Sequence, residues 1–381
     1  MDEYLTSGCL GWRLKILITD IHHGNGGGHV TYILGLLRGL GDKCQFTLAV
    51  PPTGRLFKEA STLPNVRVLP SLYTSRVLTA IPEIYRLREF LRAERFDIAH
   101  CNGGADHRHL MAASMGLREA PAIIWTKHNT NKINSFGHHL RARFGTDLCI
   151  AVSDYVSGQL ADSPYKNCAI ERIYHGLNLN HYQRVSASEK AEARHHFFGS
   201  SLQESIVFGS VGGTDIDKGW LLLVKAVSML KPELKRRVRI VVAGDRPKQE
   251  VLEQVATLGC ADQVHFPGLL QDVRVVLAAC DVGFVLSFKE SASYACYEAL
   301  ALGLPVLISD AGGLPESIEH MQEGWTVPVG DVDAIKQQVE AILNDKFCLS
   351  SFGARARQRA EGRFDEQRFA LETLSAYSLV L

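Results

Sequence analysis

The sequence predicts an α/β protein with two domains, each built on a doubly wound parallel sheet that carries helices on both faces. Short apolar segments of strand length alternate with helical patterns along the chain, and this alternation begins again near residue 205. The length of 381 residues also exceeds the roughly 100 to 200 residues of one typical domain. We therefore expect domain boundaries at 1–185, 186–362 and 363–381, with a helix-poor linker near 180–189.

The first domain begins with a strand at 14–19, a glycine-rich loop from Asp20 to Gly28, and a helical run from about 29 to 40. This arrangement lets the backbone approach a bound ligand closely, although the glycines do not match the GxGxxG dinucleotide pattern. Further strands are expected at 45–50, 66–69, 98–100, 122–127, 148–152 and 171–174. His100, His128 and His175 then each fall at the carboxyl end of a strand, the edge where such sheets bind ligands.

In the second domain, strands are expected at 205–211, 239–243, 264–266, 281–286 and 305–309. Helical patterns lie at 219–230, 248–258, 272–279 and 293–302, and a last helix is expected at 365–377. Ser291 or Ser293 can cap the helix at 293–302, and Gly303 can end it. A helix that begins directly after a strand and a polar loop leaves backbone N–H groups free to hold a diphosphate.

The composition limits the functional classes that the sequence supports. Lys plus Arg and Asp plus Glu number 41 each, so net charge gives no reason to expect nucleic-acid binding. Residues 1–185 carry 21 basic and 15 acidic side chains against 20 and 26 in residues 186–381, which would suit an acidic ligand or membrane surface facing the first half. The nine scattered cysteines suggest reduced thiols, and no apolar run reaches about 18 residues. We expect a cytoplasmic protein, free or loosely attached to a membrane.

Three charged residues are candidates for chemistry. Lys218 lies in a loop between a strand and a helix, where it could neutralise a diphosphate and stabilise it as a leaving group without a metal. Glu290 and Glu298 are separated by seven residues, so they would not stack on one helical face as a paired acid and base. We expect Glu298 to accept hydrogen bonds from a ribose and Glu290 to orient sugar hydroxyls. Solvated loop and helix-edge positions remain the alternative for all three.

Other patterns favour plainer interpretations. The pair Asp215 and Asp217 could hold Mg²⁺ or Mn²⁺, but solvation of the loop is the simpler reading, and Asp331 with Asp333 suits helix capping. The histidines are not spaced as a zinc site. The segment 76–95 is basic with an apolar stripe at Ile81, Ile84, Leu87 and Leu91. It could lie on anionic lipid, but packing on the sheet is the preferred interpretation.

The sequence resembles the retaining GT-B glycosyltransferases of family 4, which build bacterial polysaccharides and lipopolysaccharide. The most specific segment is Glu290-x7-Glu298 with EALALGLPVLISDAGGLPE, which is similar to the family signature EAMAxGxPVVxxxxGGxxE. Further similarities are GGGHVTYILGLLRGL, FDIAHCN, CIAVSDYVSGQL, IYHGLN and VAGDRP. The resemblance spans nearly the whole chain and implies two Rossmann-like domains facing a cleft, with the last helix packing back on the first domain.

The resemblance also implies roles for individual residues. The second domain would bind the nucleotide-sugar donor through Lys218, Gly244, Leu269, Glu290, Ser293, Tyr294 and Glu298, and Gly27 and Gly28 would approach the donor phosphate. His100 and His128 would line the acceptor side, and Glu290, Lys218 and His128 would act in catalysis. The donor would be a UDP-, GDP- or ADP-sugar and the acceptor a glycan or lipid-linked sugar. No cofactor or metal would be required, and the enzyme could contact the cytoplasmic face of the inner membrane.

Three positions depart from the family pattern. Gly213 stands where the family usually has Arg, Ser293 replaces the usual Gly, and the segment from His175 to Asn178 replaces N-G-V-D. The missing Arg keeps a rival hypothesis open: a GT-B sugar-nucleotide epimerase, or a subunit that binds nucleotide-sugars without transfer. A dehydrogenase fits poorly, because no acidic residue lies about 20 residues beyond the glycine loop to bind a ribose.

Overall fold

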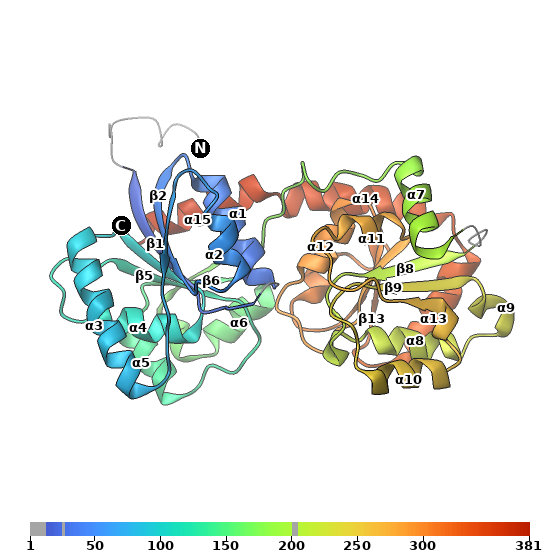
Figure 1. The fold of residues 1–381 in the computed structure, drawn as a ribbon, viewed down its shortest axis with the longest axis horizontal. Coiled ribbons are helices and arrows are strands. Elements are labelled where there is room, and N and C mark those ends of the chain that lie inside the picture. The colour runs from blue at the N-terminus through green and yellow to red at the C-terminus, as the bar shows by residue number, and fades with distance from the viewer. Residues whose placement is uncertain (1–12, 25–26, 200–204) are drawn as a thin grey trace. The chain divides into compact units, whose positions relative to one another are not determined.

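A computed structural model describes residues 13–24, 27–199 and 205–381. The chain divides into two compact units (Figure 1). The first unit comprises Met1–Val152, Ser157–Ile173 and Phe369–Leu381, and the second comprises Ser153–Val156 and Tyr174–Arg368. Within the described residues, the structure contains no helix with both the length and the apolar character needed to span a bilayer.

The first unit is organised around a seven-stranded sheet with the strand order β3-β2-β1-β4-β5-β6-β7, in which all neighbours are parallel. The central strands are almost entirely buried, as expected for a sheet covered on both faces. The strands are β1 (Leu14–Thr19), β2 (Cys44–Val50), β3 (Val66–Pro70), β4 (Ile98–Cys101), β5 (Ala122–Lys127), β6 (Leu148–Ala151) and β7 (Ala169–Arg172).

The helices of the first unit lie between these strands (Figure 1). They are α1 (Gly28–Leu40), α2 (Arg55–Ala60), α3 (Val77–Glu94), α4 (Gly104–Ser114), α5 (Phe136–Phe144) and most of α6 (Asp154–Ala161). In α3 the expected apolar stripe is only partly correct, because Leu91 is fully buried whereas Ile81 is 62% exposed. The helix packs on α4, and the Arg88 guanidinium donates a hydrogen bond of 2.9 Å to the Ala113 carbonyl.

The last helix, α15 (Glu366–Ser378), joins the first unit from Phe369 onward. Phe369 and Tyr377 are fully buried, while Leu371 is 50% exposed. Phe369 packs against Tyr32 of α1 with ring centroids 4.9 Å apart. The buried side of α15 therefore runs through positions 369, 373 and 377, which recur at helical spacing.

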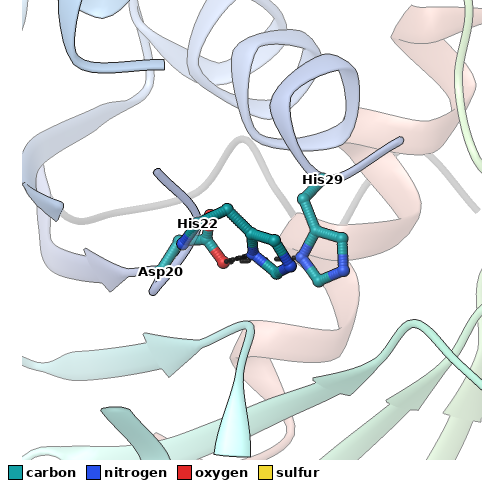
Figure 2. Close-up of side chains that lie close together, drawn as sticks. All are labelled: Asp20, His22 and His29. Carbon is teal, nitrogen blue, oxygen red and sulfur yellow. Dashed lines mark hydrogen bonds and ion pairs between the residues drawn. The ribbon is translucent and has the colours of Figure 1, made fainter. Parts of the chain in front are cut away.

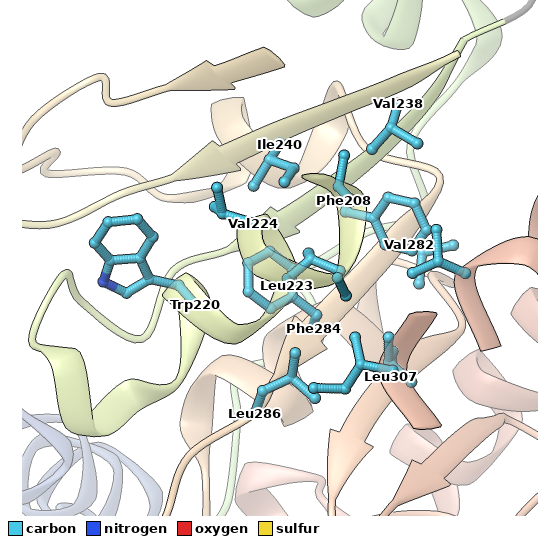
Figure 3. Packing of buried hydrophobic residues seen from close by; sticks show 14 of the residues in the cluster. Phe208, Trp220, Leu223, Val224, Val238, Ile240, Val282, Phe284, Leu286 and Leu307 are labelled. Atoms are coloured by element: carbon cyan, nitrogen blue, oxygen red, sulfur yellow. The ribbon is translucent and has the colours of Figure 1, made fainter. Parts of the chain in front are cut away.

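The second unit contains a six-stranded parallel sheet in the order β10-β9-β8-β11-β12-β13. Its strands are β8 (Ile206–Ser210), β9 (Val238–Val242), β10 (Val264–His265), β11 (Val282–Val285), β12 (Val306–Ser309) and β13 (Gly324–Val327). On one face, Trp220 and Leu223 pack against Phe208, Ile240 and other apolar side chains of the strands (Figure 3). This core fixes α8 on the sheet.

The helices of the second unit are α7 (Ala187–Phe198), α8 (Trp220–Ser228), α9 (Pro232–Lys235), α10 (Gln249–Thr257), α11 (Arg274–Ala278), α12 (Tyr294–Ala301), α13 (Val332–Asn344) and α14 (Cys348–Arg363). The expectation of a helix-poor segment at 180–189 is wrong at its end, because α7 begins at Ala187. The reason is a capping box, in which Ser186 accepts a hydrogen bond from the Glu189 N–H and the Glu189 carboxylate accepts one from the Ser186 N–H.

Candidate functional site

Each sheet has one point where the strand order reverses, between β1 and β4 in the first unit and between β8 and β11 in the second. In doubly wound sheets, the loops beyond the carboxyl ends of these two strands diverge and leave room for a ligand. The loop after β8 carries Lys218, and the loop after β11 carries Glu290. The strongest sequence candidates therefore lie where the topology favours binding.

The Lys218 loop is fixed to the end of β11 by backbone contacts. Residues 216–218 form a 3-10 turn, and the Phe288 N–H donates a hydrogen bond of 2.9 Å to the Asp217 carbonyl. Gly219 has a φ of +72°, and a Cβ atom there would lie 1.8 Å from the Leu286 carbonyl oxygen. Only glycine fits this position, so the close approach of the two loops is built into the sequence.

Lys218 and Glu290 form an ion pair, with 3.0 Å between Nζ and Oε1. The Ser287 hydroxyl donates a second hydrogen bond, of 2.9 Å, to the same carboxylate oxygen. The Glu290 side chain is 12% exposed and that of Lys218 is 32% exposed, so both remain reachable from solvent. The sequence predicted separate roles for these residues and did not predict that they pair.

The Glu290 loop leads directly into α12, whose N-terminus is capped by Ser293. The Ser293 hydroxyl accepts a hydrogen bond of 3.3 Å from the Cys296 N–H, which decides between the two predicted capping serines. The first N–H groups of a helix have no partner within the helix and attract anions. Tyr294 begins this first turn, and its ring stacks on His175 with centroids 4.7 Å apart.

Glu298 lies further along α12 and is held by a tyrosine. The Tyr182 hydroxyl donates a hydrogen bond of 2.8 Å to Glu298 Oε1. Burial and the neighbouring carboxylate raise the pKa of Tyr182 well above its usual value, so the phenol remains a donor. A carboxylate can accept up to about four hydrogen bonds, so the contact with Tyr182 is compatible with further acceptance from a ligand hydroxyl.

Two further glycine contacts shape this region. Gly244 has a φ of +149°, and a Cβ atom there would lie 2.8 Å from Gly213 Cα, so the two backbones touch. Gly213 itself has a φ of +99°, a conformation that arginine rarely adopts. The structure thus gives a backbone reason for the absence of the family arginine. Leu269 is 65% exposed in the loop after β10.

The turn after β12 contacts the backbone of the Glu290 loop. Cβ atoms at Gly312 and Gly313 would each lie 2.1 Å from a backbone oxygen, of Glu290 and Ser291 respectively. The Gly313 N–H also donates a hydrogen bond of 3.0 Å to the Glu290 carbonyl. The turn at Gly312 and Gly313 therefore positions the Glu290 backbone by direct contact.

In the first unit, Gly27 caps α1 with a φ of +108°, and Gly28 is the first residue of the helix. Asn25 and Gly26 of the same loop lie outside the described residues. His128 follows β5 and is partly exposed, and its Nε2 is 2.9 Å from Asn102 Oδ1. Gly27 and Gly28 therefore lie beyond the carboxyl end of β1, and His128 lies beyond that of β5.

His100 has a different environment from the one predicted. Its side chain is fully buried, with Nδ1 2.7 Å from the Tyr377 hydroxyl and Nε2 2.7 Å from the Thr126 hydroxyl. Burial lowers the pKa of His100 to about 3, so the ring is neutral. A side chain without exposed surface cannot touch an acceptor, and these contacts support a structural role in docking α15.

A cluster of Asp20, His22 and His29 was missed by the sequence interpretation (Figure 2). Its ligand atoms lie within 4.8 Å of one another. The hydrogen bond to Asp20 raises the pKa of His22. Burial acts to raise the pKa of Asp20, but the two imidazoles lower it overall. The sequence signal that could have revealed it is the D-x-H pattern of Asp20 and His22 directly after β1. His29 joins them because α1 begins at Gly28.

Two family models and several known proteins match this chain. A model of the family "Glycosyltransferase Family 4" matches residues 26–181, and one described as "Glycosyl transferases group 1" matches residues 192–362. The N-acetyl-alpha-D-glucosaminyl L-malate synthase of Bacillus anthracis is 26% identical over 306 residues, 78% of each chain. The lipopolysaccharide core biosynthesis glycosyltransferase LpsE of Rhizobium meliloti is 22% identical over 92% of this chain and 95% of that protein.

A solved structure of HepE from Anabaena in complex with UDP has a TM-score of 0.81 at 19% identity, covering 96% of this chain and 100% of that one. At this identity the likeness shows the fold, which is GT-B. The predicted fold class is thereby confirmed, with two parallel-sheet units of the Rossmann type. The two family models together span most of the sequence. This chain belongs to the GT-B glycosyltransferases of family 4.

Proposed function

We propose that this protein is a retaining glycosyltransferase that moves a sugar from a nucleoside-diphosphate sugar to a glycan or lipid-linked acceptor, in lipopolysaccharide or other cell-surface polysaccharide synthesis. The observation that carries the proposal is the Lys218–Glu290 pair beside the start of α12, at the strand-order reversal of the second sheet. It joins a cation, a carboxylate and a helix N-terminus in one place. The sequence relationship to LpsE supports the class of pathway.

On this proposal the donor diphosphate lies against Lys218 and the first N–H groups of α12, including those of Ser293 and Tyr294. Both stabilise the negative charge that grows on the diphosphate as it leaves, so the diphosphate requires no metal ion or other cofactor. Once the ammonium turns to the phosphate, Glu290 is released to accept hydrogen bonds from sugar hydroxyls. Glu298 accepts from the ribose diol, and residues near Gly244 and Leu269 lie beside the base.

The first unit would supply Gly27 and Gly28 near the donor phosphate and His128 on the acceptor side. Its partly exposed ring supports that assignment, whereas His100 is excluded by its burial. The structural neighbour HepE was crystallised with UDP, which supports a UDP-sugar among the UDP-, GDP- and ADP-sugars. Retention of the anomeric configuration follows the family, through attack on the face from which the diphosphate departs.

A donor screen tests the proposal. The protein is incubated with UDP-, GDP- and ADP-sugars and lipid-linked or oligosaccharide acceptors, and released nucleoside diphosphate is measured by mass spectrometry. We expect release with one donor class, dependent on acceptor, and proton NMR of the product should show the donor's anomeric configuration. Lys218→Ala and Glu298→Ala should abolish most of the release while the proteins stay folded. Full activity in both variants would refute the assigned roles.

A second candidate is a sugar-nucleotide epimerase or a subunit that binds nucleotide-sugars without transferring them. Gly213 in place of the family arginine favours it, because one phosphate cation is absent from that position. Calorimetry with the same donor panel separates the possibilities. Tight binding without nucleotide release on any acceptor would favour the binding subunit, and a changed sugar in recovered nucleotide-sugar would favour the epimerase.

The proposal extends to attachment at the cytoplasmic face of the inner membrane through α3. Leu78, Ile81 and Tyr85 are 88%, 62% and 64% exposed and share one side of the helix. Exposed arginines accompany them at positions 76, 86, 92 and 95. Apolar insertion together with arginine attraction to anionic headgroups is the pattern of an interfacial helix.

Sedimentation with vesicles tests this attachment. We expect binding to phosphatidylglycerol vesicles, weaker binding to phosphatidylcholine, and loss of binding in the Leu78→Asp, Ile81→Asp double variant. Phe347→Asp is the matched control, because Phe347 is 95% exposed in the second unit. Equal sedimentation of the wild-type protein and the double variant would show that α3 does not mediate membrane attachment.

A further inference from the structure

A group of three potential metal ligands lies at the strand-order reversal of the first sheet. Asp20 directly follows β1, His22 lies two residues further on, and His29 is in the first turn of α1. Figure 2 shows both imidazole rings directed toward the Asp20 carboxylate. The proposed donor chemistry assigns no role to these side chains, so a function for the cluster is independent of it.

The spacing of the ligand atoms suits a metal ion. His22 Nδ1 is 2.9 Å and His29 Nδ1 is 3.4 Å from the same oxygen, Asp20 Oδ1. An ion such as Zn²⁺ lies about 2.0 to 2.2 Å from nitrogen and oxygen ligands, so neighbouring ligand atoms of a tetrahedral site are separated by roughly 3.3 to 3.6 Å. The His29–Asp20 separation falls within this range, whereas the His22–Asp20 separation is shorter and is that of a hydrogen bond. All three ligand atoms lie within 4.8 Å of one another, so small side-chain movements would bring them around one ion.

Burial provides an independent reason. The Asp20 side chain is fully buried, and a buried carboxylate requires a compensating positive charge. His29 Nδ1 is buried, and its 3.4 Å contact with Asp20 Oδ1 is longer than an ordinary hydrogen bond. A metal ion among the three side chains would satisfy both groups at once. Two protonated imidazoles would also neutralise Asp20, and a metal titration distinguishes the two cases.

The surrounding charge also favours a cation. A second buried carboxylate, Asp106, accepts a hydrogen bond of 2.9 Å from the Thr19 hydroxyl, directly before Asp20 in the chain. The N-terminus of α1 carries partial positive charge, which opposes a cation. The full charge of the Asp20 carboxylate within the cluster outweighs that partial charge. The site is therefore better suited to a divalent cation than to an anion.

We propose that Asp20, His22 and His29 bind a divalent first-row transition-metal ion, of which Zn²⁺ fits the ligand set best. Two imidazoles and one carboxylate favour such an ion over Mg²⁺ or Ca²⁺, which prefer oxygen ligands alone. Three protein ligands leave a coordination position open for water or an oxygen of a bound molecule. The His128 ring, 4.2 Å from the His29 ring between centroids, lies next to that position.

Cobalt binding tests the proposal without donor or acceptor, so its failure would leave the proposed function untouched. Untagged protein is stripped of metal and titrated with Co²⁺, whose visible absorption reports nitrogen and oxygen coordination. We expect one equivalent to bind with a saturating absorption change, and Zn²⁺ to displace it. His22→Ala and His29→Ala should weaken binding by more than the roughly 10- to 100-fold seen when an outer partner of a ligand is lost.

His23→Ala is the matched control, because His23 is exposed in the same loop and lies outside the cluster. It should bind Co²⁺ as the wild-type protein does. Asp20→Asn, which keeps the shape of the buried side chain, should also lose binding, and circular dichroism should show that each variant is folded. Absence of stoichiometric binding, or equal binding in the wild type and both ligand variants, would overturn the proposal.

Discussion

Replacing Lys218 with methionine separates binding chemistry from folding at the candidate donor site. The ammonium lies 3.0 Å from Glu290, and its side chain is 32% exposed. A partly exposed ion pair contributes about 1 kcal/mol or less to folding, so the free energy of unfolding should change little. A hydrogen bond from a charged group to a diphosphate is worth about 1.5 to 3 kcal/mol, which corresponds to roughly 10- to 150-fold.

Because the diphosphate gains charge as it leaves, most of this loss should appear in kcat. The assay measures nucleoside-diphosphate release with the donor that the screen identifies, beside urea unfolding of the same preparation. Lys225→Met, an exposed lysine of α8, is the control and should match the wild type. If Lys218→Met kept kcat/KM within about threefold of the wild type while remaining folded, the assignment of Lys218 to the diphosphate would be wrong.

Three further predictions concern the surrounding structure. Tyr182→Phe removes the donor that orients Glu298, so the donor KM should rise by roughly 2- to 12-fold with little change in kcat, and an unchanged KM would separate Glu298 from the ribose. Gly219→Ala places a Cβ 1.8 Å from a carbonyl oxygen at a φ of +72° and should lower the free energy of unfolding by about 2 kcal/mol or more, whereas Gly362→Ala, with open space around it, should not. Burial lowers the pKa of His100 to about 3. Between pH 6.5 and 3 the unfolded chain therefore binds a proton that the folded chain does not, so the free energy of unfolding decreases as the pH is lowered. Between pH 7 and 5 this contribution is about 2 kcal/mol, so urea unfolding of His100→Gln should be less pH-dependent than that of the wild type by that amount, and an equal pH dependence would contradict the burial argument.

The alternation of apolar strands and helices was sufficient to predict both parallel sheets except for the edge strand β13. It failed where helices carry little apolar periodicity. Helix α7 buries only Ala193, so its sequence reads as polar, and the S-x-x-E capping signal at Ser186 was the only local indication of its start. Helix α14 was missed for a related reason, because its buried positions are mostly small residues among arginines and serines.

At the candidate site, motif spacing identified the right loops but not the contacts between them. Lys218 and Glu290 are 72 residues apart, and they meet because β8 and β11 are neighbours in the sheet. For His100 the sequence pattern predicted a site residue that the structure buries. A position near the carboxyl end of a strand does not ensure exposure, and β4 is buried throughout. The approach of His29 to Asp20 depends on where α1 begins, which spacing rules for metal ligands do not capture.

The contact of Gly312 and Gly313 with the backbone of the Glu290 loop has an evolutionary consequence. The position of that loop is fixed in part by contacts between main-chain atoms. If the loop binds the donor as proposed, the neighbouring side chains can change, and alter which sugar or base is selected, without moving this contact. Replacement of either glycine would instead displace the loop itself.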